Sequence, residues 1–181
     1  PVICETVPQC KVITIIRDPR DVINSIIKKQ WLTNAALGRT AWPYKVGANK
    51  SFAPHWVEDA RFDQWQEWNL ETRSCYMWNL YAAQLIPLVK HKEHRLNSDS
   101  QPDIHIIRYE SLLQSPFETV TSLAKHCERE FSPLTHIRLG EIKSSNTKKY
   151  DQFESYKKAI DSQLLQQMAK LSQKLGYNYE V

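Results

Sequence analysis

Two short apolar runs in this chain each lead into a charged segment and then into a helical pattern. The first, CKVITII (residues 10–16), is almost continuously apolar, which is typical of a strand buried on both faces of a parallel sheet. DPRDVINSIIKKQ (residues 18–30) follows, where Asp18 is a good N-cap, Pro19 suits the first helical position and apolar residues share one face. The pattern predicts a strand that passes directly into a helix.

The second run, IHIIRY (residues 104–109), predicts another buried strand. SPFETVTSLAKHC (residues 115–127) then predicts a helix, because Ser115 and Glu118 have the spacing of a capping box. A proline at the first helical position strengthens this prediction. The second strand is thus also followed by a helix, as in a parallel α/β sheet.

Longer helical patterns fill most of the remaining chain. Residues 58–95 are expected to be mostly helical, with a bend or restart at Pro87, and residues 154–175 form a last helix that ends at Gly176. PVIC (residues 1–4) is a candidate third strand. Strands that alternate with helices predict a parallel sheet, and so few strands lead us to expect that part of the sheet precedes residue 1.

Residues 31–57 interrupt these patterns, since two of the four glycines lie here together with prolines and aromatic residues. They predict a long loop or lid, and loops of this length in compact domains are usually functional or disordered. The aromatic rings suit stacking on a sugar or a phenol. A loop held in place by buried aromatic side chains is an equal alternative.

Composition limits the class of protein. At 181 residues and 41% hydrophobic content, the chain favours one domain with a packed core. The net charge of +4 suits an anionic ligand, and without a basic run interleaved with aromatics we expect no nucleic-acid partner. The four cysteines show no C-x-x-C spacing, so no metal is expected, and no stretch is long enough for a membrane span. A cytoplasmic location is the default, and a targeting or anchoring segment before Pro1 stays open.

Candidate chemistry lies where the two strands end. Arg17 follows the first strand, and Ser25 lies seven residues beyond the cap Asp18, about 10 Å along the helix at nearly the same azimuth. A guanidinium and a hydroxyl so placed are suited to one phosphate, and an ion pair between Arg17 and an acidic neighbour is an equal alternative. Tyr109, at the end of the second strand, is suited to an adenine ring or a phosphate, with simple packing as the alternative.

The ordered set of segments resembles sulfotransferases that use 3′-phosphoadenosine 5′-phosphosulfate (PAPS). The similarity rests on R-D-P-R-D-V with its serine, on RYESLLQSPFETVTSLAKHC, on CYMWNLYAAQL and on KLGY, over about residues 10–28 and 68–180. It implies a P-loop NTPase-like parallel sheet flanked by helices, with PAPS as donor and no metal. It also implies that Arg17 and Ser25 hold the 3′-phosphate, that Tyr109 touches the nucleotide, and that Lys148 or Lys149 supplies a late basic group; a solvated lysine pair is the alternative.

One departure from the family concerns the loop that grips the 5′-phosphosulfate. All four glycines lie after the R-D-P-R-D segment, and none precedes a Lys-Ser/Thr pair after a predicted strand. We therefore expect that loop to precede residue 1 and the chain to be the C-terminal portion of a sulfotransferase-like domain.

The resulting hypothesis is sulfuryl transfer from PAPS to a hydroxyl or amine acceptor, a small molecule or a carbohydrate. A non-catalytic nucleotide-binding module that keeps the 3′-phosphate site is the alternative. A phosphotransferase is disfavoured, because G-x-x-x-x-G-K-[ST] is absent. The catalytic base stays unassigned, with His55, Glu58 and Glu5 as weak candidates, and the oligomeric state is open.

Overall fold

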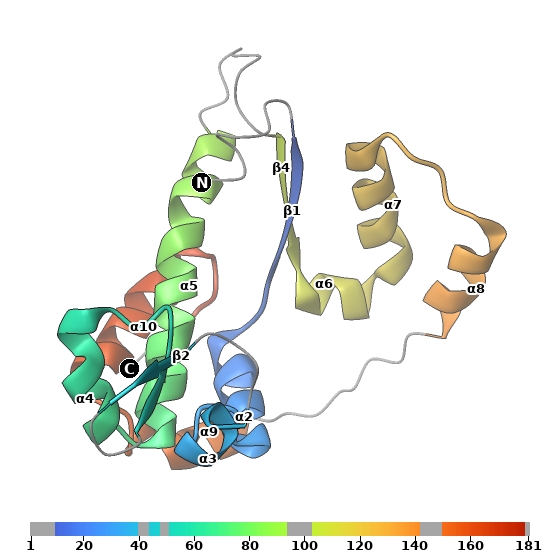
Figure 1. The fold of residues 1–181 in the computed structure, drawn as a ribbon. Helices are drawn as coiled ribbons and strands as arrows, with labels where there is room; N and C mark the ends of the chain where they lie inside the picture. Colours follow the sequence, from blue (N-terminus) through green and yellow to red (C-terminus); the bar gives the residue numbers. More distant parts are fainter. Residues whose placement is uncertain (1–9, 40–43, 48–50, 94–102, 142–149, 180–181) are drawn as a thin grey trace. The chain divides into compact units, whose positions relative to one another are not determined.

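The computed structural model describes residues 10–39, 44–47, 51–93, 103–141 and 150–179. These residues form two compact units (Figure 1). The strand unit comprises residues 1–17 and 87–147, and the helical unit comprises residues 18–86 and 148–181. Among the described residues, no helix combines the length and the apolar character needed to cross a membrane.

The strand unit contains the parallel pair that the sequence predicts. Strand β1 (Lys11–Ile16) pairs with β4 (Asp103–Arg108) in parallel, and Ile16 lies opposite Arg108 at the end of the pair. The chain continues from β4 into α6 (Tyr109–Gln114), α7 (Pro116–Cys127) and α8 (Pro133–Gly140). The second strand therefore ends one residue earlier than predicted, and Tyr109 is the first residue of a helix. Helix α8 was not predicted.

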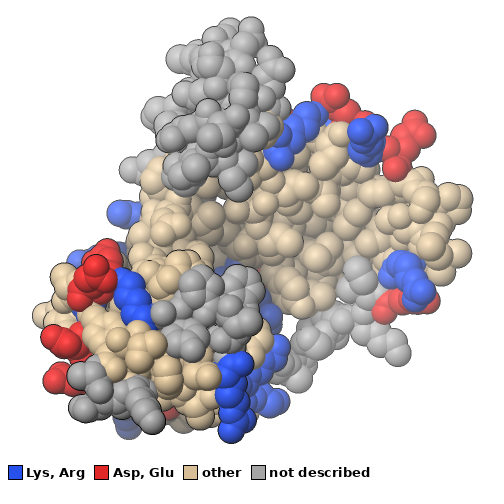
Figure 2. All heavy atoms as spheres, in the orientation of Figure 1, with Lys and Arg blue, Asp and Glu red and all other residues tan. Residues whose placement is uncertain are grey.

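One face of this sheet is only partly covered. Helix α7 packs on β4, where Ile107 is buried, while Ile13 and Ile15 on the neighbouring strand are 42% and 57% exposed. Burial of the first strand on both faces was predicted, and within the described residues this prediction is wrong. On the face seen in Figure 2, the charged side chains of the strand unit, at the right, lie along its rim and its centre is uncharged.

The predicted capping box of α7 does not form. Ser115 is the N-cap residue, but its side chain makes no capping hydrogen bond. Its backbone N–H donates to the carbonyl of Ser111 at 2.8 Å, which closes the last turn of α6. Because Ser115 ends one helix and begins the next, its backbone adopts φ −136° and ψ 65°, outside the extended region that an N-cap usually prefers.

The helical unit begins with α2 (Pro19–Lys29), and its predicted start is confirmed. The side chain of Asp18 accepts a hydrogen bond from the backbone N–H of Arg20 at 2.9 Å, and Pro19 occupies the first turn. The apolar face of α2 is buried through Ile23, Ile26 and Ile27 and packs against α9 (Tyr150–Lys157).

Two predictions about long helices need correction. Helix α5 (Leu70–Glu93) continues through Pro87 and does not restart there. The single helix predicted over residues 154–175 is two helices, α9 and α10 (Ser162–Lys174), because Asp161 caps α10 by accepting from the backbone N–H groups of Gln163 and Leu164, both at 3.0 Å. The predicted stop is confirmed, since Gly176 follows α10 with a φ of 75°.

The segment predicted as a long loop contains regular structure. It holds the short helix α3 (Asn34–Leu37) and an antiparallel pair, β2 (Tyr44–Val46) with β3 (Phe52–Pro54). The 3₁₀ turn η1 (Asp59–Arg61) and helix α4 (Phe62–Glu67) follow. Strands of three residues leave little alternating pattern in a sequence, which is why only the loop prediction was available. The candidate strand at residues 1–4 lies outside the described residues.

The buried thiol of Cys75 in α5 should be chemically inert. Burial, and secondarily the negative charge of Asp161, raise its pKa to about 12. At pH 8 about one Cys75 thiol in ten thousand is then the reactive thiolate in the folded protein. We expect iodoacetamide at pH 8 to modify the half-buried Cys127 and to spare Cys75, as read by peptide mass spectrometry.

In urea the thiols of Cys75 and Cys127 should react at similar rates, because unfolding returns the pKa of Cys75 to an ordinary value of about 8.5. The neutral thiol is favoured in the folded state, so folding loses stability as pH rises above that unfolded value. Equal alkylation of the two cysteines in native buffer would contradict this assignment.

Candidate functional site

The structure brings two of the predicted nucleotide-binding residues together in the strand unit. Ile16 and Arg108 are paired at the ends of β1 and β4, so Arg17 and Tyr109 leave the sheet at equivalent positions. The guanidinium carbon of Arg17 lies 4.4 Å from the centroid of the Tyr109 ring. In open α/β sheets, ligands bind beyond these carboxyl ends of parallel strands. A cation and an aromatic face from distant parts of the sequence thus meet where a nucleotide would be expected.

The two arginines of R-D-P-R-D have different surroundings. Asp18 is 3% exposed and accepts from Arg20 through Nε at 3.0 Å and Nη2 at 2.6 Å, so this carboxylate balances the charge of the second arginine. Arg20 also lies 5.6 Å from the ring centroid of Tyr179, whose pKa is raised to about 12 chiefly by burial. Arg20 is therefore part of the packing around the start of α2.

Ser25 belongs to the helical unit, whereas Arg17 belongs to the strand unit. Ser25 lies half-buried in the middle of α2, in the helical unit. Its joint action with Arg17 on one phosphate stays a prediction. Lys148 and Lys149 lie outside the described residues.

The candidates for a catalytic base do not gain support from their surroundings. His55 follows β3 and is exposed. The carboxylate of Glu58 is 65% exposed and lies 3.7 Å from the guanidinium of Arg61, which is an ordinary surface ion pair. Glu5 lies outside the described residues. Within the described ranges, no group of three or more His, Cys, Asp or Glu side chains is arranged to hold a metal ion.

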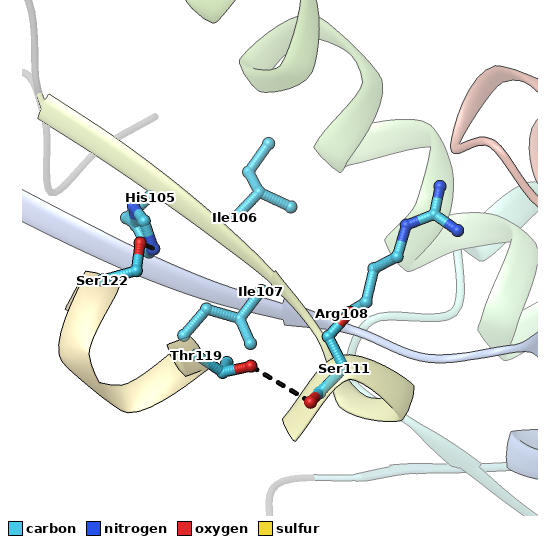
Figure 3. A pocket seen from close by; sticks show the side chains of 7 residues that line it. All are labelled: His105, Ile106, Ile107, Arg108, Ser111, Thr119 and Ser122. Carbon is cyan, nitrogen blue, oxygen red and sulfur yellow. Dashed lines mark hydrogen bonds between the residues drawn. The ribbon is translucent and has the colours of Figure 1, made fainter. Parts of the chain in front are cut away.

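An open pocket of about 410 Å³ lies beside β4 in the strand unit, bounded by α6 and α7. Figure 3 shows its lining residues, which are His105, Ile106, Ile107, Arg108, Ser111, Thr119 and Ser122. Its hydroxyl groups are largely engaged within the protein: Thr119 Oγ1 donates to the Ser111 carbonyl at 3.1 Å, and Ser122 Oγ lies 3.2 Å from His105 Nε2. The side chain of Arg108 points away from Thr119 in Figure 3.

Sequence reasoning missed an aromatic cluster in the helical unit. The ring of Trp56 contacts Trp65 edge-on at a centroid distance of 5.6 Å and lies 6.3 Å from Tyr76 and from Tyr81. Trp65 is fully buried, and its indole N–H donates to the carbonyl of Phe52 at 3.0 Å. Buried aromatic side chains therefore do hold the paired strands β2 and β3 in place, while Tyr81 remains 48% exposed. The number of tryptophans was the signal, but no spacing indicates which rings meet.

The sequence of the chain matches the family model described as the sulfotransferase domain over residues 5–175. A solved structure titled "Sulfotransferase Domain from the Curacin Biosynthetic Pathway" is similar to the fold, with a TM-score of 0.50 and 15% sequence identity. The similarity covers 94% of this chain and 54% of that protein, so the chain spans about half its length. No curated protein matches the sequence.

These comparisons confirm the resemblance drawn from the R-D-P-R-D and R-Y-E segments, and with it the α/β fold, which is P-loop-like in sulfotransferase domains. The family match spans nearly the whole chain, including residues 31–57, which the sequence resemblance left out. The chain belongs to the sulfotransferase domain family.

Proposed function

We propose that this chain forms the 3′-phosphate side of a PAPS-binding site and that the protein to which it belongs transfers a sulfuryl group to a hydroxyl or amine acceptor. The acceptor is a small molecule or a carbohydrate. Membership of the sulfotransferase domain family supports the reaction class. The observation that carries the donor assignment is the guanidinium of Arg17 over the ring of Tyr109, at the ends of neighbouring parallel strands.

The residues at the strand ends fit a 3′-phosphorylated adenosine. A guanidinium presents forked, charged donors that match phosphate oxygens. An aromatic ring beside it offers a flat apolar surface on which a purine can stack. Ser25 would add a neutral hydroxyl donor to the same phosphate.

The contribution of these residues is binding and orientation. PAPS supplies the transferable sulfuryl group and a phosphate leaving group. Holding the 3′-phosphate at a fixed point orients the far end of the donor for in-line displacement, and binding energy spent this way lowers the entropic cost of the reaction. Removing the proton of the acceptor is assigned to no residue of this chain.

A second candidate function is nucleotide binding without catalysis. It is considered because the chain contains no G-x-x-x-x-G-K-[ST] segment. On this hypothesis Arg17 and Tyr109 would bind the 3′-phosphorylated nucleotide while the chain itself transfers nothing.

Titration calorimetry with two nucleotides tests the donor site. We expect the chain to bind adenosine 3′,5′-bisphosphate about tenfold or more tightly than adenosine 5′-monophosphate, because charge-assisted hydrogen bonds to the extra phosphate contribute roughly 1.5–3 kcal/mol. Equal affinity for the two nucleotides would end the PAPS assignment.

A transfer assay then separates the enzyme from the binding module. PAPS labelled in the sulfuryl group is incubated with the full-length gene product and with a phenol, an amine and a hexosamine as acceptors. Labelled product supports the enzyme, whereas bisphosphate binding without transfer to any acceptor supports the second candidate.

A further inference from the structure

Two histidine rings stack where α7 packs on the sheet of the strand unit. His105 on β4 and His126 in the last turn of α7 have ring centroids 5.0 Å apart and planes that differ by 29°. His105 Nε2 also lies 3.2 Å from the hydroxyl of Ser122, one turn earlier in α7 (Figure 3). The contact between α7 and β4 therefore contains a pair of titratable groups, which we call the histidine pair.

One ring of the histidine pair is almost enclosed. The side chain of His126 is 7% exposed, and its Nδ1 lies 3.4 Å from a carboxylate oxygen of Asp103 on β4. Among the residues that the structure describes, its buried Nε2 has no hydrogen-bond partner. A neutral ring can donate through Nδ1 and leave only a lone pair at Nε2, whereas a protonated ring carries a buried N–H there without an acceptor. The single carboxylate of Asp103 can balance one positive charge of the pair.

The other charged groups at this end of α7 come from β1 and from the residues after the helix. Lys11 Nζ donates to the carbonyl of His126 at 2.7 Å and to Glu128 Oε1 at 2.6 Å. Lys11 is paired with Asp103 in the sheet register, and Arg129 and Asp103 both act on the charge of Glu128. Among these groups, Asp103 is the carboxylate in contact with the histidine pair, because Glu128 is paired with the lysine.

We propose that the histidine pair is a pH-sensitive switch that holds α7 on the sheet near neutral pH and releases it in mildly acidic solution. Histidine is the side chain that gains its charge in this range. In the docked helix the first proton is balanced by Asp103, and a second proton places two cations 5.0 Å apart in a largely buried contact. In the released helix both rings are solvated and take up protons independently. The released state therefore binds more protons, and acidification favours it.

Release of α7 changes the surroundings of β4. The pocket of about 410 Å³ beside this strand loses one wall, because Thr119 and Ser122 of α7 line it. The hydrogen bond from Thr119 to the carbonyl of Ser111 in α6 is lost as well. The switch does not depend on the proposed function, since its groups join α7 to the sheet and need no nucleotide.

Hydrogen exchange of the full chain at about pH 7.5 and about pH 5.5 tests the switch. We expect the protection factors of the α7 amides, which correct for the intrinsic effect of pH on exchange, to fall about tenfold or more at the lower pH. The protection of α10, in the helical unit, should stay within about twofold. Equal protection of α7 at the two pH values, or an equal loss in α10, would overturn the proposal.

Substitutions of two histidines in the strand unit identify the groups responsible. His105→Gln keeps a polar partner for Ser122 but takes up no proton, so the fall in α7 protection should shrink to within about twofold. The matched control is His136→Gln, which removes an exposed histidine on α8 whose ring lies 5.9 Å from Phe117. This control should keep the fall seen in the wild type. If both variants keep the fall, or both lose it, the histidine pair is not the switch.

A variant of the carboxylate keeps the proposal testable if His105→Gln does not fold. Asp103→Asn leaves the first proton of the pair without its partner, so α7 should lose protection at a higher pH than in the wild type. Glu141→Gln, which removes an exposed carboxylate paired with Arg138, should leave the midpoint of this loss unchanged. A midpoint in Asp103→Asn that equals that of the wild type, or lies below it, would overturn the switch.

Discussion

Replacing Arg17 with alanine is expected to remove most of the preference of the chain for adenosine 3′,5′-bisphosphate over the 5′-monophosphate. Charge-assisted hydrogen bonds contribute roughly 1.5–3 kcal/mol, so affinity for the bisphosphate should fall roughly tenfold to a hundredfold. The monophosphate lacks the group that Arg17 would hold, and its affinity should change much less. Calorimetry of both nucleotides with both proteins gives the difference directly.

The matched control for Arg17→Ala is Arg108→Ala. Arg108 ends β4, is exposed and precedes Tyr109, so it carries the same charge close to the proposed site. If the nucleotide responds only to local positive charge, the two variants will lose affinity equally, and this result would contradict a specific role for Arg17. Raising the salt concentration should modestly lower the affinity of both variants for the bisphosphate, and the difference between the two affinities should persist.

Replacing Trp65 with alanine is expected to produce the largest loss of stability in the chain, about 3–5 kcal/mol. Trp65 is fully buried, contacts Trp56, Trp68 and Tyr76, and donates to the carbonyl of Phe52. Its removal creates a cavity, leaves that carbonyl without its donor and removes the ring beneath the buried Arg73 guanidinium. Urea denaturation monitored by circular dichroism measures the change in the free energy of unfolding.

Trp31→Ala is the matched control for stability. This ring is 54% exposed, and it lies 4.5 Å from the ammonium of Lys29. A cation–π contact at the surface contributes about 0.5–1 kcal/mol, so the midpoint of unfolding should shift little. If the two tryptophan variants unfold at the same urea concentration, the aromatic cluster is not the core of the helical unit.

Sequence patterns predicted the elements whose signals are local. Continuous apolar runs identified β1 and β4, and Asp18 with Pro19 identified the start of α2, because apolar runs and helix caps are local features of a sequence. The break before α10 was equally local, since Asp161 is a good N-cap. It was overlooked because the apolar period continues across it.

Other features depend on residues that are distant in sequence. The bonds of Arg73 to the carbonyls of Leu32 and Trp65, and the meeting of Trp56 with Trp65, arise only after the chain has folded, so no spacing predicts them. The capping box at Ser115 failed for a related reason, because α6 had already engaged its backbone. For the candidate site, the sequence predicted that Arg17 and Tyr109 each lie at the end of a strand. The structure adds that the two strands are neighbours and that the two side chains contact each other.

The most direct test of the donor site is a crystal structure of the chain with adenosine 3′,5′-bisphosphate. We expect the 3′-phosphate to lie within hydrogen-bonding distance of the Arg17 guanidinium and the Ser25 hydroxyl, roughly 2.7–3.2 Å, with the adenine against Tyr109. A nucleotide bound elsewhere, or a 3′-phosphate that contacts neither Arg17 nor Ser25, would contradict it.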